Sequence, residues 1–158
     1  MCGIAVIFGE KNPNLLKEMM AKLHHRGPDE DGVYFSNNIS MGHKRLSIID
    51  VSSGIQPMYN DDKSIAIVFN GEIYNFKEIR RELEGKYNFK TNSDTEVILH
   101  LYEEKGTSCV NDLHGMFAFA IYDNGSVFFA RDRIGIKPLF IAEDEGKIFA
   151  ASEMKCLS

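Results

Sequence analysis

The last third of the sequence consists of short apolar segments separated by turn residues. The segments are MFAFAIYD, SVFFARD, PLFIAED and KIFAASE, and the separators are NG, RIGIKP and EG. Separators of this kind join antiparallel strands, because Asn-Gly and similar pairs tolerate the backbone angles of tight hairpin turns. We therefore predict an antiparallel β-meander over residues 116–153.

Further strands are expected in the first half of the chain. Asn37 and Asn38 form a turn signal between two of them, and Gly42 is a candidate interruption of the second. The stretches are IAVIF (4–8), GVYFS (32–36), ISMGHKRLSIID (39–50) and SIAIVFNG (64–71).

Three segments carry apolar residues at helical spacing. The segment that begins at Ser93 has the strongest signals, because Ser93 and Glu96 match the S-x-x-E pattern of a capping box and Gly106 ends the periodicity. Asn75 is the expected N-cap of the preceding helix. We expect helices over 13–25, 75–86 and 93–106.

Strands and helices in this order predict an α+β domain. The 158 residues fall within the range of about 100–200 residues expected of one domain. No linker, repeat or low-complexity stretch divides them. The strands are numerous enough for two sheets, each of which needs helices to cover its outer face.

Charge and composition argue against several classes of function. A net charge of −5 with scattered Lys and Arg argues against nucleic-acid and membrane-surface binding, and favours small molecules or proteins as partners. No apolar run approaches the roughly 18 residues of a membrane span, and the N-terminus lacks the features of a signal peptide, so we expect a cytoplasmic protein. Three distant cysteines and five histidines without ligand spacing predict no metal site.

Cys2 has two interpretations. From its position alone, a small apolar residue at the start of a buried strand is favoured. The chemical interpretation requires removal of Met1, which the small neighbouring side chain permits. The free α-amine of Cys2 could then take the proton of the thiol and return it later, so that one residue holds both nucleophile and base.

A cysteine nucleophile that attacks a carboxamide needs preorganised N–H donors for the oxyanion. Asn70 offers a side-chain amide and Gly71 an unobstructed backbone N–H. An isolated Asn-Gly pair is more often a type I′ turn, and the sequence alone favours that interpretation here.

Three charged residues have a structural and a substrate-binding interpretation. Arg45 is either solvated or suited to bidentate capture of a carboxylate. Asp94 either interacts with the dipole of the helix that follows it or binds an ammonium group together with Glu72. The loops HRGPDEDG and RDRIGIKPLF are structural on pattern alone, and no Walker loop, GxGxxG or SGGxDS motif for ATP or a dinucleotide occurs.

Taken together, these stretches resemble the glutaminase domain of class II glutamine amidotransferases, most closely that of glutamine-hydrolysing asparagine synthetases. The similarity runs nearly end to end, and eight motifs in family order are far more specific than any one. They are MCGI, HRGPD, RLSIID, NGEIYN, SDTEV, GMFAFAIYD, RDRIGIKPL and ASEMKCL.

The resemblance implies a four-layer αββα sandwich of two stacked antiparallel sheets, of the Ntn-hydrolase type. It also implies a role for each candidate residue. Cys2 is the nucleophile with its own α-amine as base, and Asn70 and Gly71 form the oxyanion hole. The substrate-binding residues implied are Arg45 for the α-carboxylate, Ile49 for the pocket lining, and Glu72 with Asp94 for the α-ammonium.

The activity implied is hydrolysis of glutamine to glutamate and ammonia through a Cys2 thioester, with the ammonia passed to an ATP-dependent asparagine synthetase domain. We expect residues 1–158 to be the glutaminase domain of a longer chain, with the synthetase domain absent, no cofactor here, and ATP and Mg needed only there. Two alternatives stay open: a different amide-forming acceptor enzyme, and a catalytically silent domain kept for binding or packing. The resemblance also makes a homodimer reasonable.

Overall fold

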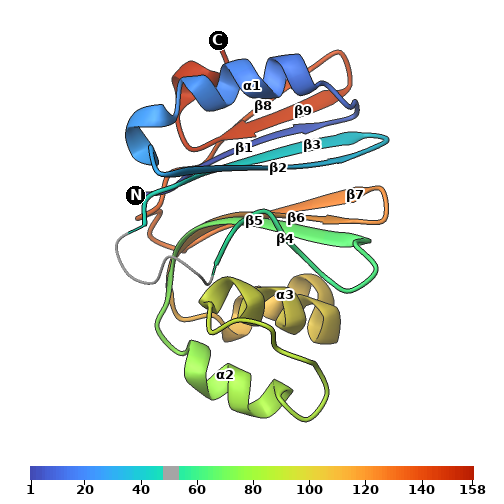
Figure 1. The fold of residues 1–158 in the computed structure, drawn as a ribbon, viewed down its shortest axis with the longest axis vertical. Coiled ribbons are helices and arrows are strands. Elements are labelled where there is room, and N and C mark those ends of the chain that lie inside the picture. The colour runs from blue at the N-terminus through green and yellow to red at the C-terminus, as the bar shows by residue number, and fades with distance from the viewer. Residues whose placement is uncertain (48–53) are drawn as a thin grey trace.

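The computed structural model describes residues 1–47 and 54–158, which form two stacked antiparallel sheets between helices (Figure 1). One sheet has the strand order β2-β3-β1-β9-β8 and the other the order β4-β5-β6-β7. The strands of the first sheet are β1 (Gly3–Phe8), β2 (Glu30–Ser36), β3 (Ile39–Arg45), β8 (Phe140–Asp144) and β9 (Lys147–Ala151). Those of the second are β4 (Met58–Tyr59), β5 (Ile65–Ile73), β6 (Gly115–Asp123) and β7 (Ser126–Arg131).

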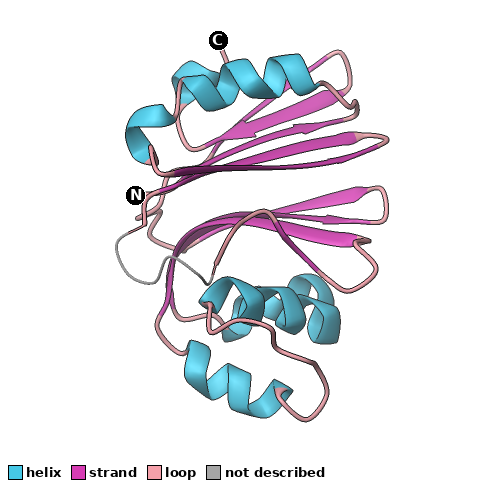
Figure 2. Ribbon diagram, viewed as in Figure 1, coloured by secondary structure: helices cyan, strands magenta, loops and turns pink. Residues whose placement is uncertain are grey.

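Helices cover the outer face of each sheet (Figure 2). Helix α1 (Pro13–Ala21) lies on the first sheet, α3 (Asp94–Lys105) lies on the second, and α2 (Phe76–Leu83) packs against α3. Short 3-10 turns follow at His24–Arg26, Gly106–Asp112 and Met154–Cys156. The predicted α+β sandwich with an αββα layer order is therefore confirmed. No helix in the described part of the chain is long and apolar enough to cross a membrane.

Strand β1 shows why the chain begins with an uninterrupted apolar run. Successive side chains of a strand point to opposite faces. Ile4 and Val6 pack in the core between the sheets, whereas Ala5 and Ile7 pack under α1. Both faces of β1 are buried, so the strand needs apolar residues at every position.

Two hairpins form where the last third predicted them, but they do not make one meander. Strands β6 and β7 pair in the second sheet, and β8 and β9 pair in the first. The chain crosses between the sheets in the RIGIKP segment, because Asp132 binds the backbone N–H groups of Ile136 and Lys137 and turns the chain there. The expectation of a continuous meander is wrong at this crossing.

Gly42 does not interrupt β3. It pairs with Ala5 on one side and Val33 on the other within a continuous strand. A Cβ atom at this position would lie 2.3 Å from the sulfur of Met20. The glycine therefore lets α1 pack closely on the sheet, which a pattern of local propensities cannot reveal.

Helices α2 and α3 begin after the predicted N-cap residues Asn75 and Ser93, but their capping hydrogen bonds differ from those that the motifs predict. The Ser93 hydroxyl accepts a hydrogen bond from Thr95 N, while the Glu96 carboxylate turns back to the N–H groups of Lys90 and Thr91, so the reciprocal capping box is not formed. The side chain of Asn75 does not cap α2 but bonds to the backbone of the segment that precedes β6.

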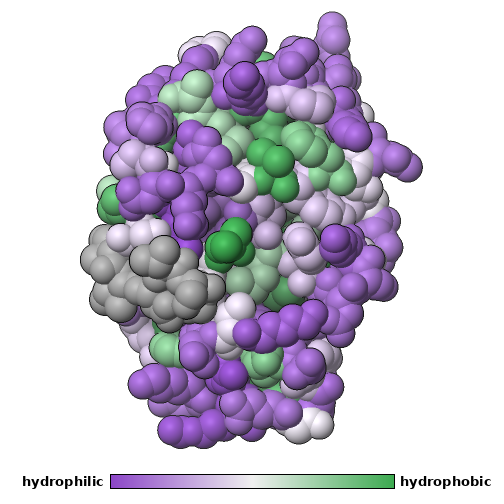
Figure 3. All heavy atoms as spheres, in the orientation of Figure 1, coloured by the Kyte–Doolittle hydropathy of each residue, from purple (hydrophilic) through white to green (hydrophobic). Residues whose placement is uncertain are grey.

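Hydrophilic side chains cover the helical ends of the molecule on the face in Figure 3. Apolar residues reach the surface mainly between those ends, over the edges of the sheets. This distribution is ordinary for a sandwich whose inner faces supply the core.

Candidate active site

Strand alternation brings the candidate residues to the same end of the space between the sheets. Ile4 and Val6 face this space from β1, and Ala66 and Val68 face it from β5. By the same period of two, Cys2 and Asn70 extend these two rows. Both residues line one cavity of about 570 Å³.

Cys2 lies immediately before β1 and is partly exposed. Its carbonyl oxygen is 3.4 Å from Nη1 of Arg26, and the next residues are fixed by a pair of bonds between Ile4 and Ser152. Met1 is 57% exposed and lines the same cavity. A processed chain would therefore present both the thiol and the α-amine of Cys2 to this cavity.

Asn70 lies inside β5 and is 2% exposed. Its side-chain Nδ2 is buried and has no hydrogen-bond partner among the described residues. A buried amide donor without a partner costs free energy, so this group is a strong indication of a ligand-binding position. The interpretation of Asn70–Gly71 as a type I′ turn is wrong, because both residues pair with β6.

Gly71 presents its N–H away from β6. It lies opposite Phe117, whose own N–H and C=O are bonded to Asp132 on the other side of β6. Opposed residues in an antiparallel pair alternate between bonded and non-bonded pairs, so Gly71 and Phe117 form a non-bonded pair. The N–H of Gly71 therefore faces the free edge of β5, on the side of the cavity.

The same register explains why this position is a glycine. A Cβ atom on residue 71 would lie 2.1 Å from the carbonyl oxygen of Met116, and the residue has a φ of +154°. Any larger residue would force β5 and β6 apart. The register that orients the N–H of Gly71 therefore depends on the absence of a side chain.

Arg45 ends β3 on the face directed to the second sheet and is 8% exposed. Its Nη1 donates to Oε2 of Glu30 at 2.9 Å, while its backbone carbonyl accepts from Asp29 N at 3.1 Å. The HRGPDEDG loop thus holds the arginine in place. A guanidinium oriented by a carboxylate and lining the cavity is suited to a second carboxylate from a ligand.

Asp94 and Glu72 bring negative charge to the same cavity. Oδ2 of Asp94 accepts from Ile73 N at 3.0 Å, which ties the start of α3 to the end of β5. Burial raises the pKa of Asp94, and the nearby charge of Glu72 raises it further. Hydrogen bonds from backbone N–H groups act in the opposite direction. The positive charge of a ligand ammonium would stabilise these carboxylates in their ionised form, against the effects of burial and mutual repulsion.

Six of the seven candidate site residues therefore line one cavity, and Ile49 lies outside the described residues. The sequence interpretation did not single out Gln56, Thr95 or Lys137, which line the cavity too. Lys137 is 9% exposed, and it comes from the RDRIGIKPLF loop, which the pattern alone classed as structural. The signal that could have found it is the charged residue between two apolar ones in that loop.

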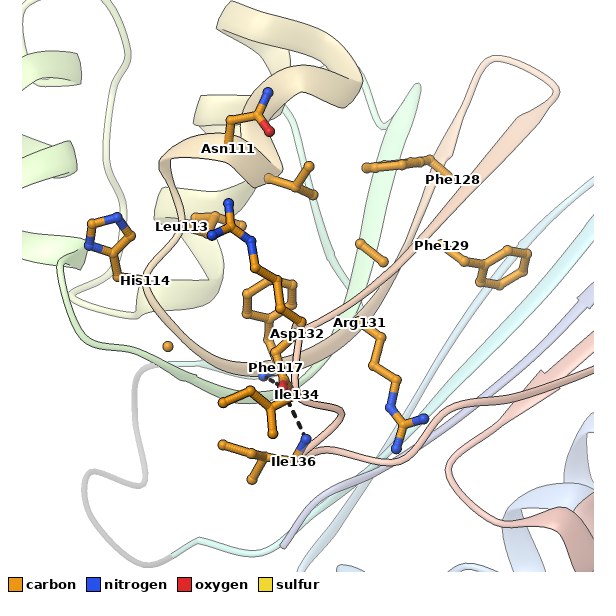
Figure 4. A pocket seen from close by; sticks show the side chains of 14 residues that line it. Asn111, Leu113, His114, Phe117, Phe128, Phe129, Arg131, Asp132, Ile134 and Ile136 are labelled. Atoms are coloured by element: carbon orange, nitrogen blue, oxygen red, sulfur yellow. Dashed lines mark hydrogen bonds between the residues drawn. The ribbon is translucent and has the colours of Figure 1, made fainter.

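A second cavity, of about 560 Å³, lies beside Asp132 on the outer side of β6 and β7 (Figure 4). Asp132 binds Ile136 N and Phe117 N at its base, and isoleucines and phenylalanines form much of its wall. None of the candidate site residues lines it. The chemistry expected from the sequence belongs to the first cavity.

Comparison with known proteins gives one family and several close relatives. The model of the glutamine amidotransferase domain family matches residues 1–158. Asparagine synthetase B [glutamine-hydrolysing] of Escherichia coli is 47% identical over 99% of this chain and 30% of its own length. Asparagine synthetase [glutamine-hydrolysing] 3 of Arabidopsis thaliana is 46% identical over 100% of this chain and 28% of its own. The chain thus spans less than a third of these relatives.

Solved structures show the same fold at lower identity. The glutamine phosphoribosylpyrophosphate amidotransferase of Bacillus subtilis, solved with ADP and GMP, superposes with a TM-score of 0.85. It is 22% identical, and the match covers 99% of this chain and 43% of that chain. This likeness supports the arrangement of the sheets and helices.

Proposed function

Because the chain belongs to the glutamine amidotransferase domain family, whose model matches residues 1–158, we propose that it hydrolyses the side-chain amide of glutamine to glutamate and ammonia. Its fold is the Ntn-hydrolase sandwich of that family. The observation that carries the proposal is the position of Cys2 in one cavity with the unpartnered amide of Asn70 and the outward N–H of Gly71.

The first step is attack of the Cys2 thiol on the carboxamide carbon. The α-amine of Cys2 takes the thiol proton as the S–C bond forms, and it returns that proton to the departing nitrogen when the C–N bond breaks. The negative oxygen of the tetrahedral intermediate accepts hydrogen bonds from Asn70 Nδ2 and Gly71 N. Ammonia leaves, and water then hydrolyses the γ-glutamyl thioester to release glutamate.

Substrate selection depends on two kinds of charge that line the cavity, a positive charge on Arg45 and negative charges on Glu72 and Asp94. Arg45 binds the α-carboxylate of glutamine, and Glu72 with Asp94 binds the α-ammonium. A simple amide would leave these groups unpaired, and a site built to pair a polar group discriminates strongly against an analogue that lacks it.

We propose that the ammonia is used by an ATP-dependent asparagine synthetase domain outside these 158 residues. The support is that the relatives are glutamine-hydrolysing asparagine synthetases of which this chain matches less than a third of the length. In this scheme the glutaminase step needs no cofactor, since nucleophile, base and oxyanion donors all come from the protein. ATP and Mg would be needed only in the synthetase domain.

We also propose a cytoplasmic location, which is consistent with three cysteines that remain free thiols.

Trapping of the thioester tests the proposed activity. The protein, with removal of Met1 verified by intact mass, is incubated with glutamine and hydroxylamine. Formation of γ-glutamyl hydroxamate and release of ammonia are expected, and both are lost in Cys2→Ala. A variant that keeps a residue before Cys2 is the matched control and should be inactive, because its α-amine is blocked. Absence of hydroxamate and ammonia with the correctly processed protein would contradict the proposal.

A further inference from the structure

Strand β5 loses its outer neighbour just before the candidate oxyanion hole. Strand β4 pairs with β5 only at Ala66 and Ile67. The N–H and C=O of Phe69 point to the same edge as those of Ile67, because main-chain groups alternate along a strand. The N–H and C=O of Phe69 therefore lie beyond Met58, the first residue of β4. Because these groups are buried, they need other hydrogen-bond partners.

Two side chains supply these partners. Oε1 of Gln56 accepts from Phe69 N at 2.6 Å, and Nε2 of His43 lies 3.1 Å from Phe69 O. His43 is 1% exposed and Gln56 is 8% exposed. A carbonyl oxygen can only accept, so the imidazole Nε2 carries the proton and donates it. The carbonyl that His43 holds belongs to the peptide bond between Phe69 and Asn70.

Gln56 also connects this strand to the helix that carries Asp94. Its Nε2 donates to Oγ1 of Thr95 at 3.2 Å. The backbone of residue 56 packs so closely on β2 that a Cβ atom on Gly32 would lie 1.8 Å from the Gln56 carbonyl oxygen. The side chain of Gln56 thus fixes the distance between the Asn70 strand and the start of α3.

We propose that His43 and Gln56 are positioning residues that hold the Phe69–Asn70 peptide where Asn70 Nδ2 and Gly71 N can bind the oxyanion. This inference rests on the proposed glutaminase activity. His43 does not line the cavity that contains Cys2 and Asn70, so it acts through strand β5 rather than on the substrate. Small displacements of preorganised donors reduce the rate of the chemical step, while ground-state binding by the charged residues of the cavity is little affected.

The test compares variants that remove or keep the hydrogen-bond donor. In His43→Leu we expect kcat for glutamine hydrolysis to fall by about tenfold to a hundredfold while KM changes little. His43→Gln keeps a donor and should recover most of kcat. Gln56→Leu removes the other contact and should lower kcat in the same way, and His24→Leu, at an exposed histidine, is the matched control.

A second measurement separates positioning from general structural support. The aldehyde glutamate γ-semialdehyde forms a hemithioacetal with Cys2 that carries the same oxyanion, whereas L-norvaline has the same α-carboxylate and α-ammonium but no γ-oxygen for Asn70 and Gly71 to bind. We expect the aldehyde to bind His43→Leu and Gln56→Leu more weakly, by the same factor as the loss in kcat. Binding of L-norvaline should be unchanged.

Several outcomes would overturn the inference. Wild-type kcat and aldehyde affinity in a folded His43→Leu or Gln56→Leu protein would do so. An equal loss of affinity for the aldehyde and for L-norvaline would also do so, because it indicates a general disruption of the cavity. If His43→Leu does not fold, the kcat and aldehyde affinity of Gln56→Leu and His43→Gln test the inference instead. Failure of the wild-type protein to hydrolyse glutamine would instead refute the proposed function itself.

Discussion

The Nε2 atom of His43 on β3 lies 3.1 Å from the carbonyl oxygen of Phe69 on β5, so that one hydrogen bond joins the two sheets beside Asn70. Burial lowers the pKa of His43 to about 4, with Arg45 adding to the effect and the bond to Phe69 opposing it. The imidazole is therefore neutral in the folded protein at neutral pH.

This bond predicts a specific dependence of stability on pH. The unfolded chain protonates His43 near its ordinary pKa of about 6.5, whereas the folded protein resists protonation until about pH 4. Between these values the unfolded state binds more protons, so stability falls as pH falls. The free energy of unfolding should drop by roughly 3 kcal/mol across this window, measured by urea denaturation at several pH values.

His43→Gln provides the comparison, because it keeps a neutral donor and removes the titrating group. The difference in unfolding free energy between wild type and variant should change across pH 6.5–4 and be constant at higher pH, which cancels the effects of Asp94 and other carboxylates. Parallel curves through this window would contradict a neutral buried His43.

Covalent labelling should distinguish Cys2 from the other two thiols. Burial raises the pKa of Cys109 to about 11 and also raises that of Cys156. An electrophilic glutamine analogue, such as a diazoketone, should therefore add once, at Cys2, as located by peptide mass spectrometry. Excess glutamine should slow the labelling, and Cys2→Ala should abolish it. Equal labelling of Cys109 would indicate a different arrangement.

Local sequence signals were sufficient for the elements and for the layer class. The helix at Ser93 and the hairpins around Asn124–Gly125 and Glu145–Gly146 depend on neighbours in the chain, and the glycines of both turns have positive φ. The sequence did not predict the crossing between the sheets, because the crossing depends on Asp132 binding backbone N–H groups of the loop and of Phe117 on β6, which no local pattern reveals. Gly42 was likewise misjudged, since its reason is the sulfur of Met20.

The site could be predicted from the motifs, but its supporting residues could not. Cys2 and Asn70 are chemically conspicuous, and the resemblance assigned them together. Gln56 has no local signal: its importance arises because β4 begins only at Met58, opposite Ile67, and leaves the outer edge of β5 at Phe69 without a strand partner. Such roles follow from the register of the sheet, which a single sequence does not fix.

Gly71→Ala should destabilise the protein, because the new Cβ would lie 2.1 Å from the carbonyl oxygen of Met116 and the backbone would have to move. We expect a loss on the order of 2–4 kcal/mol in unfolding free energy. Gly85→Ala is the matched control, since a Cβ there meets nothing within 4 Å. Thermal unfolding of both variants checks the prediction, and equal midpoints would refute the close approach of β5 and β6.

Asp94→Asn should relax the selection for the α-ammonium group. The amide oxygen can still accept from Ile73 N, so the start of α3 is preserved while the charge is lost. We expect KM for glutamine to rise by about tenfold to a hundredfold, with a smaller change in kcat. An analogue without the α-amine should be used equally well by variant and wild type. If the variant still strongly favours glutamine over that analogue, Asp94 does not bind the ammonium.

The loop after β7 should depend on the carboxylate of Asp132. Its oxygens accept from the N–H groups of Phe117, Ile136 and Lys137 at 2.9–3.1 Å. Burial opposes ionisation, but these backbone groups together hold the pKa of Asp132 below its ordinary value. Stability from this group is therefore present above the ordinary carboxyl pKa and is lost as pH falls below it.

Asp132→Ala should cost about 3 kcal/mol or more at pH 7, because it leaves three backbone donors without an acceptor. Asp132→Asn keeps one acceptor oxygen and should cost less, and Asp144→Ala, at an exposed carboxylate on β8, should cost almost nothing. The same loop carries Lys137 to the cavity of Cys2, so Asp132→Ala should also lower glutaminase activity in the fraction that folds. Urea denaturation at pH 7 and pH 3 measures the loss of stability, and a smaller penalty is expected at pH 3, below the ordinary carboxyl pKa, because there the unfolded wild-type chain binds a proton at this carboxylate. An unchanged unfolding free energy in Asp132→Ala would refute the view that this carboxylate organises the crossing between the two sheets.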